Sequence, residues 1–441
     1  MARANPVENQ SPDKRVRPMT GRSAGDGRPR PALAALLVLG LAALAFGDEA
    51  ARLLSLDEAV GQALGRNPAV LRARQEADAA RGRRLQLQAA PAPELSFEAA
   101  ALPLWNDKGG EEFSLGLRQL VEFPGKRGLR REIGRSGEAQ AALELERVRS
   151  IVRGRVEKAY WQAVHARRQL DGLTSVMATL EEYSELAAAR YKSGQVPYLD
   201  IVRGRVETLR LRNEIVEARR NLKERTAALE LLMGERDYAP LDLSTDMGFT
   251  PVGKSLEELK AAALAGSSLR LAAERRRQAE HAAALARKAG LPDFTVGLFT
   301  PSKRLGGWGF EVGLTLPFFS TSARGAAVES EAMERQVAIA AEARRSGALF
   351  ALESAYADAR ALEDEIVLFR DTMMREVEES LKAGLLNYQY GRADSLGVLD
   401  IVRGLKDARA EFLRALLNHQ LALIDIATAG EDDGFGAASN D

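Results

Sequence analysis

Three aspartates and two arginines lie just beyond two predicted reversals of the chain. Asp200 and Asp400 each stand three residues before an arginine, Arg203 and Arg403, and Asp394 stands closest to the second reversal. A carboxylate in the first turn of a helix interacts favourably with the helix dipole and caps free amide groups. Carboxylates and guanidinium groups also form ion pairs, worth under about 1 kcal/mol at an exposed surface. The sequence therefore predicts helix caps and ion pairs here, either within one helix or between helices.

No catalytic or metal-binding constellation accompanies these residues. His165, His281 and His419 are not spaced three or four residues apart as a helical metal site requires, and the chain has no cysteine. The usual nucleophile, phosphate-binding and zinc-protease motifs do not occur in the sequence. We therefore expect a protein that is not an enzyme and that has no metal site and no cofactor.

The two reversals belong to a sequence repeat of roughly 200 residues. Residues 191–204 and 388–404 share tyrosine, glycine and leucine positions and the string Asp-Ile-Val-Arg-Gly. Gly194 and Gly391 stand where a long helix must reverse, and glycine readily adopts the left-handed conformation of such a turn. Two alignments are open, because matching the glycines places Asp200 opposite a glycine, whereas matching the strings requires a three-residue insertion.

Each half of the chain has the same order of elements: a helix, a two-stranded hairpin, a very long helix, a tight turn and a further helix. Alternating apolar and polar residues predict strands at about 94–101, 112–120, 293–300 and 308–316. Proline-free runs follow the hairpins, from about residue 126 to 190 and from about 322 to 388. At 1.5 Å per residue the first run is a coiled-coil-like helix of roughly 95 Å. The predicted fold class is mainly α with a small β part, built from duplicated halves.

The duplication sets the predicted domain boundaries, with a first repeat at 48–250 and a second at 251–429. An apolar run at residues 31–46 follows basic residues and precedes small ones. It is too short for a membrane-spanning helix and predicts a signal peptide. With the extension before it, this segment takes up residues 1–47. Residues 430–441, rich in Gly, Asp, Ser and Asn, predict a disordered tail.

Charge and strand number exclude further classes. The chain of 441 residues has Lys+Arg 62 and Asp+Glu 62, a formal net charge of zero, whereas a nucleic-acid-binding domain carries a clustered basic excess. Four strands cannot close a barrel, for which about eight are needed. In a bilayer every backbone polar group must be paired. We therefore expect several copies to pool their strands, eight from two chains or twelve from three.

This order of elements, with these motifs, resembles the TolC-like outer membrane efflux family. The resemblance covers about residues 53–429 and rests on the two reversal segments together with residues 122–127 and 316–319. It implies a homotrimer with a twelve-stranded β-barrel in the lipid of the outer membrane, continued by a periplasmic α-helical tunnel. It also implies passive export of small solutes, with a periplasmic adaptor protein and an inner membrane pump as partners. Gly125-Lys126-Arg127 is similar to the heavy-metal branch, so metal ions are a candidate cargo.

The resemblance places the two reversals at the far periplasmic end of the tunnel, as the gate and the adaptor contact. The residues that it singles out are Gly194, Asp200, Arg203, Gly391, Asp394, Asp400 and Arg403. One inward aspartate per chain, repeated around a threefold axis, would form an acidic ring that attracts cations. Arginine pairs between helices would hold such a tip closed.

Two other classes of protein stay open at this point. A periplasmic adaptor also has a long helical hairpin, but it inserts one hairpin into β-rich domains. A structural coiled-coil protein would have long helices, but it gives the alternating strands no role.

Overall fold

The computed structural model describes residues 52–100, 112–235, 241–243, 245–300, 307–317, 321–429 and 431. All of them belong to the same structural unit. The predicted signal peptide and extension, residues 1–47, lie outside the described residues. So does the predicted tail, residues 430–441, apart from Glu431.

The duplicated order of elements is present in the structure. The first half comprises β1 (Arg52–Leu54), α1 (Leu56–Arg66), α2 (Pro68–Gln88), β2 (Glu94–Ala100), β3 (Glu112–Val121), α3 (Lys126–Lys192) and α4 (Tyr198–Met233). The second half comprises β4 (Leu241–Leu243), α5 (Leu256–Leu264), α6 (Ser267–Arg287), η1 (Lys288–Gly290), β5 (Phe294–Phe299), β6 (Gly309–Leu314), α7 (Ser322–Leu368), η3 (Phe369–Met373), α8 (Met374–Gln389) and α9 (Ser395–Ala427). Helices α1 and α5 both begin with a capping box, at Ser55 and Ser255.

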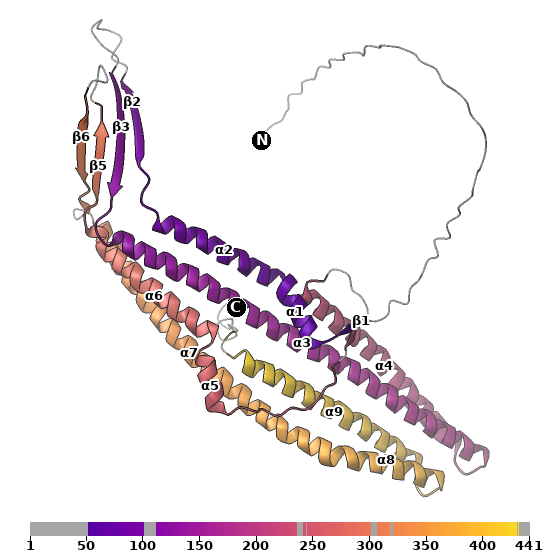
Figure 1. Cartoon of the computed structure of the whole chain (residues 1–441). Coiled ribbons are helices and arrows are strands. Elements are labelled where there is room, and N and C mark those ends of the chain that lie inside the picture. Colours follow the sequence, from indigo (N-terminus) through magenta and orange to yellow (C-terminus); the bar gives the residue numbers. More distant parts are fainter. Residues whose placement is uncertain are drawn as a thin grey trace, which may run out of the picture. The chain divides into compact units, whose positions relative to one another are not determined.

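The four predicted strands form one antiparallel sheet in the order β2-β3-β5-β6 (Figure 1). Each strand begins and ends within two residues of its predicted range. Strands β3 and β5 join the hairpins of the two halves, with Leu117 paired to Leu298. The outer strands β2 and β6 have no partner on their far edges within the described chain. Each outer strand therefore presents a row of free backbone groups.

The two faces of this sheet differ in chemistry. Leu95, Leu117, Leu298 and Phe310 form one row across all four strands, and all four side chains are exposed. The opposite face consists mostly of glutamate, serine, threonine and glycine, with Arg118 among them. An apolar face that the described chain leaves uncovered indicates a non-aqueous neighbour or another protein surface.

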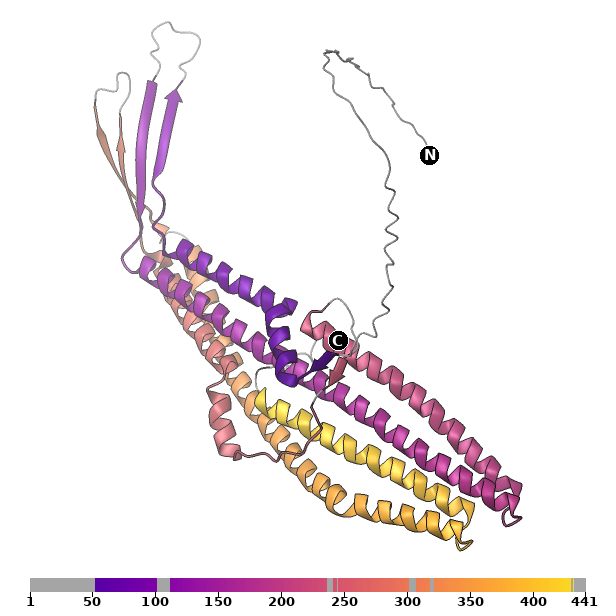
Figure 2. The ribbon, with the colours of Figure 1, turned by 45° about the vertical axis from the view of Figure 1, so that its right-hand side comes forward.

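Two long rods form the helical part. Helix α3 is continuous for 67 residues, as predicted. In the second half α7, η3 and α8 follow one another from residue 322 to 389, so the second long helix is also present. It contains a π-helical turn, η3, that the sequence did not predict. Towards the sheet α3 packs against α2 and α6, and towards the reversals it packs against α4 and α9 (Figure 2).

Helix ends meet at the level where the neighbours of α3 change from α2 and α6 to α4 and α9. Asn67 Nδ2 donates to the carbonyl oxygen of Leu232 near the end of α4, at 2.8 Å, and Asn67 Oδ1 accepts from the amide of Ala69 in α2, at 2.9 Å. Glu431, just beyond α9, accepts a hydrogen bond from the amide of Ser267 in the first turn of α6, at 3.1 Å. Side chains thus satisfy backbone groups that helix ends leave free.

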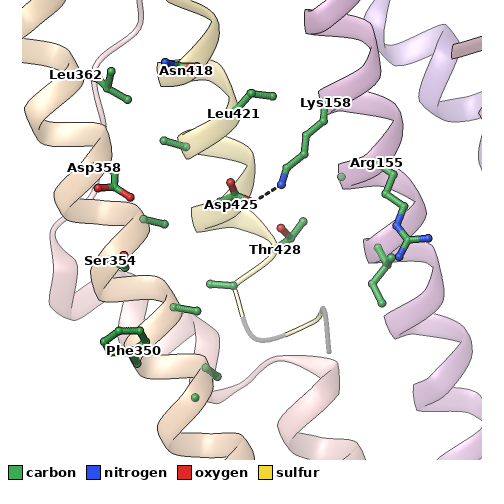
Figure 3. A pocket seen from close by; sticks show the side chains of 18 of the residues that line it. Arg155, Lys158, Phe350, Ser354, Asp358, Leu362, Asn418, Leu421, Asp425 and Thr428 are labelled. Atoms are coloured by element: carbon green, nitrogen blue, oxygen red, sulfur yellow. Dashed lines mark hydrogen bonds and ion pairs between the residues drawn. The ribbon is translucent and has the colours of Figure 1, made fainter. Parts of the chain in front are cut away.

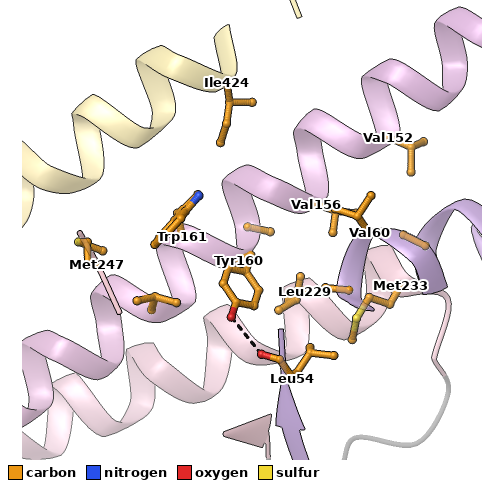
Figure 4. Close-up of a cluster of buried hydrophobic side chains, with 14 of the residues drawn as sticks. Leu54, Val60, Val152, Val156, Tyr160, Trp161, Leu229, Met233, Met247 and Ile424 are labelled. Atoms are coloured by element: carbon orange, nitrogen blue, oxygen red, sulfur yellow. Dashed lines mark hydrogen bonds between the residues drawn. The ribbon is translucent and has the colours of Figure 1, made fainter. Parts of the chain in front are cut away.

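The main apolar core lies where α1, β1, α3, α4 and α9 meet (Figure 4). In it the rings of Tyr160 and Trp161 meet edge to face at 5.9 Å, and the Tyr160 hydroxyl donates to the Leu54 carbonyl at 3.0 Å. A second cluster, around Tyr183 and Tyr388, lies near the reversals. These two clusters hold the rods together at different heights.

Residues 122–127 have a structural role at the foot of the sheet. Lys126 is buried, and its Nζ lies 2.9 Å from Asp293 Oδ1 and 2.8 Å from the Leu291 carbonyl oxygen. The amide of Phe123 donates to the same carboxylate at 2.8 Å. The residues that resemble the heavy-metal branch therefore fasten the first half of the chain to the second.

Candidate functional site

The two reversals have the same backbone geometry. Gly194 has φ 74° and Gly391 has φ 76°, the left-handed conformation that the sequence predicts. Helix α4 begins at Tyr198 and α9 at Ser395, each four residues after its glycine. The glycine alignment of the repeat therefore holds, and the second Asp-Ile-Val-Arg-Gly string lies about one helical turn deeper than the first.

The three predicted aspartates have three different environments. Asp394 is the N-cap of α9, and its Oδ1 accepts a hydrogen bond from the amide of Gly397 at 2.9 Å. Asp200 is 6% exposed, and its Oδ1 lies 3.6 Å from the guanidinium of Arg203 in the same helix. The side chain of Asp400 is 74% exposed. Asp394 and Asp400 are therefore both exposed, whereas Asp200 is buried.

Glu207 links the α3–α4 hairpin to the α8–α9 hairpin. Arg403 Nε and Nη2 donate to the two carboxylate oxygens of Glu207, each at 2.9 Å, and Arg403 Nη1 donates to Asp400 at 3.1 Å. Such bidentate charged pairs are among the stronger hydrogen bonds in proteins. The bond from Arg403 lowers the pKa of Glu207, which keeps the carboxylate charged at neutral pH. Arg203 pairs instead with Asp200 of its own helix, so of the two predicted arginines it is Arg403 that connects helices.

Two tyrosines and an arginine add a second link between the hairpins. The Tyr183 hydroxyl lies 2.6 Å from Ser395 Oγ at the start of α9, and its ring centroid lies 5.2 Å from that of Tyr388. Arg190 donates from Nη1 to the Tyr388 carbonyl oxygen at 2.6 Å and lies 4.7 Å above the Tyr388 ring. Burial raises the pKa of Tyr388, so its phenol stays neutral. The guanidinium of Arg190 therefore lies at the C-terminal end of α8, where a positive charge interacts favourably with the helix dipole and with the tyrosine ring.

The hairpins separate further from the reversals. Lys406 Nζ still reaches Glu214 at 3.0 Å, but beside this pair a cavity of about 480 Å³ opens between α3, α4 and α9. A hollow of about 740 Å³ lies between α3, α7 and α9, where Lys158 pairs with Asp425 (Figure 3). Both are lined by carboxylates, basic groups and small apolar side chains.

Within the described residues no three His, Cys, Asp or Glu side chains are grouped so that they could hold a metal ion. None of the helices described is long and apolar enough to span a membrane. Burial lowers the pKa values of His165 and His419, which favours neutral imidazoles. The reversals carry a network of contacts between helices.

Several of these contact residues were not predicted from the sequence. Glu207 ends a string, Ile-Val-Arg-Gly-Arg-Val-Glu, that also occurs at residues 151–157, and this repetition is a signal that could have drawn attention to it. Tyr388 matches Tyr191 in the glycine alignment. Arg190 gave no local signal, because its role depends on a helix roughly 200 residues away in the sequence.

Solved structures with the same fold include outer membrane channels. The chain is similar to CusC, solved in work on transmembrane channel formation, with a TM-score of 0.75 and 21% identity over 85% of this chain and 91% of that chain. It is similar to the open state of the MtrE outer membrane channel of Neisseria gonorrhoeae, with a TM-score of 0.72 and 19% identity over 85% of this chain and 88% of that one. The sheet, the rods and the paired reversals thus form the fold seen in these outer membrane channels.

Sequence comparison supports the same class. The cobalt-zinc-cadmium resistance protein CzcC of Cupriavidus metallidurans is 24% identical over 380 residues, covering 84% of this chain and 88% of CzcC. The family model of the outer membrane efflux proteins matches residues 59–235 and 259–429. The chain therefore belongs to the outer membrane efflux protein family, and it is an outer membrane protein with a periplasmic helical part. This membership replaces the adaptor and coiled-coil hypotheses.

Proposed function

We propose that the chain is the duct protomer of a tripartite efflux system and that it carries small solutes passively from the periplasm or the pump to the exterior. The sheet is the observation that supports this most strongly. Its apolar face is exposed beside a polar face, and strands β2 and β6 have no further partner strand among the described residues. A bilayer-spanning barrel needs an apolar outer face, a polar inner face and partners for both edges.

The protomers form a homotrimer, in which three sheets supply twelve strands. Exposed apolar residues on two different helices support this assembly, with Leu209 and Val216 on α4 and Val328, Ile339 and Phe350 on α7. The α7 residues recur every eleven positions, which keeps them on one helix face. Two different surfaces of one chain that pack against each other generate a ring of identical subunits when the rotation between neighbours closes.

The two reversals form the periplasmic tip and contact the adaptor protein, which in turn binds the inner membrane pump. Exposed aromatic and leucine side chains surround both turns: Tyr191, Tyr198 and Leu199 at the first, and Tyr390 and Leu396 at the second. A small apolar patch with a charged rim is typical of a protein–protein interface, here one with a helical hairpin of the adaptor.

The links between the hairpins hold the tip in its closed arrangement. The proposed gate and adaptor-contact residues are Gly194, Asp200, Arg203, Gly391, Asp394, Asp400 and Arg403, and we add Glu207 and Arg190 because their hydrogen bonds join the two hairpins. Asp394 acts as a cap and Asp200 is covered, so Asp400 is the best candidate for an acidic ring.

The cargo is a small solute, and the name of CzcC supports divalent metal ions as one class. A duct needs no tight metal site, since tight binding would slow release. The two repeats at residues 48–250 and 251–429 each contribute one hairpin of strands and one helical hairpin to the duct.

Native mass spectrometry of the mature chain, extracted from outer membranes in mild detergent, tests this function. We expect the mass of three chains, and single channels when the particles are placed in planar bilayers. A monomer or dimer that extracts without detergent would contradict the duct and the barrel.

A further inference from the structure

Residues 245–254, which connect β4 to α5, lie as a strap across α7 and α9. The amide of Val252 donates to Glu363 Oε1 of α7 at 2.6 Å, and Gln420 Nε2 of α9 donates to the Gly248 carbonyl oxygen at 2.9 Å. The strap therefore bridges the two helices through one hydrogen bond to each.

A histidine is buried beneath the strap. His419 of α9 is 0% exposed, and neither ring nitrogen has a hydrogen-bond partner among the described residues. Its ring centroid lies 5.2 Å from that of Phe249 of the strap, and its Nε2 lies 3.8 Å from Glu363 Oε1. Burial lowers the pKa of His419, and the nearby carboxylate of Glu363 opposes this shift only in part. The closed strap therefore covers a neutral imidazole.

The charged groups around His419 already have partners. From α7, Glu363 accepts from Val252 and from Arg360. From η3, Arg370 lies 5.9 Å from the centre of the Phe249 ring and pairs with Asp371. From the strap and α3, Asp246 pairs with Arg168. A proton on His419 would thus add a buried charge whose nearest counter-ion is committed to holding the strap.

We propose that the strap is an acid-sensitive latch, in which protonation of His419 releases residues 245–254 from α7 and α9. Release lets water reach the imidazolium and frees Glu363 to pair with it, at the loss of the Val252 hydrogen bond. It also uncovers the π turn η3, whose Arg370 lies against the ring of Phe249 of the strap. The proposal does not depend on what the duct transports or on its number of subunits.

The direction of the pH effect follows from the two states. In the released strap the exposed imidazole has the ordinary pKa of about 6.5, whereas in the closed strap it resists protonation. The closed state is therefore fully stable above about pH 6.5 and loses stability as the pH falls below that value. Between pH 7.5 and 5.5 the opening equilibrium should rise by up to about tenfold.

Hydrogen–deuterium exchange of the full chain in detergent, read by mass spectrometry, tests the latch. Exchange of peptides covering residues 245–254 is compared at pH 7.5 and 5.5 after correction for the intrinsic pH dependence of exchange. We expect up to about tenfold less protection at pH 5.5 in the wild-type protein and no such change in His419→Leu, which fills the site without a titrating group. His281→Gln on α6 is the matched control and should behave as wild type.

Two outcomes would overturn the latch. One is a wild-type strap with equal corrected protection at both pH values, a result that needs no variant. The other is a pH effect that persists unchanged in His419→Leu, since another group would then be responsible. If His419→Leu does not assemble, Phe249→Ala should give low protection at both pH values, and a protected strap in that variant also counts against the proposal.

Discussion

At the residue scale, the contact between Arg403 and Glu207 is one of the links that hold the two hairpins together. Glu207→Gln keeps the shape of the side chain but removes the charge that both guanidinium bonds use. Hydrogen bonds to charged groups contribute roughly 1.5–3 kcal/mol, so we expect a looser tip. In planar bilayers the variant should open more often or conduct more than wild type.

Glu224→Gln is the matched control for this experiment. Glu224 is also on α4 and is paired with Arg220, but both of these side chains are well exposed, where ion pairs contribute little. Equal conductance of Glu207→Gln, Glu224→Gln and wild type would mean that the pair does not restrain the tip.

Arg118 sets the charge of the polar face of the sheet. Its Nε lies 3.0 Å from Glu311 Oε2, and in the strand register it lies directly opposite Glu94 of β2. If this face lines the barrel, Arg118→Gln leaves its carboxylates without their counter-charge. We expect the reversal potential in a salt gradient to move towards greater cation selectivity, whereas Arg135→Gln on an exposed part of α3 should change nothing. An unchanged reversal potential would show that this face does not line the conducting path.

The aspartates show how far sequence reasoning reaches at this scale. Asp394 could be predicted as a cap, because capping depends on residues three positions apart. The burial of Asp200 could not be predicted. It depends on tertiary packing, which brings Tyr183 of α3 close to Asp200 of α4.

At the element scale, the long helices and strands were predictable because their signals are local. An absence of proline and an alternation of apolar residues are visible in short windows of sequence. The π turn η3 leaves no such mark, since it arises where α7 and α8 pack against α9 and the strap. The pairing of β3 with β5 was also not predictable, because either strand could have formed the edge of its hairpin.

Three glycines in Arg-Gly dipeptides of the long helices are not equivalent. A Cβ added at Gly204 would lie 2.9 Å from Cε1 of the buried Tyr183, whereas a Cβ at Gly404 meets nothing within 4 Å, and at Gly154 it would lie 2.8 Å from Thr428 Cγ2. The string that occurs twice thus places glycine at two close helix crossings.

Gly204→Ala and Gly404→Ala separate crowding from helix propensity. Alanine favours a helix interior by about 1 kcal/mol over glycine, so Gly404→Ala should raise the midpoint of thermal unfolding. In Gly204→Ala this gain is outweighed by crowding of Tyr183, which costs roughly 1–3 kcal/mol, so the midpoint should fall. Both midpoints are measured in the same detergent, and a rise in both would mean that Tyr183 moves aside freely.

At the scale of the whole molecule, the sequence repeat predicted two equivalent halves but not how they share their neighbours. Near the sheet α2 lies beside α3 and α6 lies between α3 and α7, whereas towards the reversals α4 and α9 take these two places. Asn67 lies where α2 gives way to α4, and Glu431 lies where α6 gives way to α9. Each half therefore supplies helices to both the sheet end and the reversal end of one layer of helices, called the wall below. The exposed apolar side chains then gather on the helices at the two ends of that wall.

Ile339 of α7 provides the test at this scale, because it is among the most exposed large apolar side chains of the described chain, at 72%. Within one protomer the exposed Ile339 side chain makes few packing contacts, so Ile339→Glu should leave the fold intact. In a ring of three chains the same carboxylate would be buried against the neighbouring chain without a partner, which costs several kcal/mol. We therefore expect folded monomers in native mass spectrometry, with helical circular dichroism like that of wild type.

Ala273→Glu on α6 is the matched control, because it also places a carboxylate at an exposed apolar position. Helix α6, however, lies between α3 and α7 rather than at the end of the wall. This control should assemble as wild type does. If Ile339→Glu also assembles into trimers, α7 does not form the contact between protomers. The exposed residues of α4 would then have to pack against a different surface of the neighbouring chain, and the order of helices around the tunnel would change accordingly.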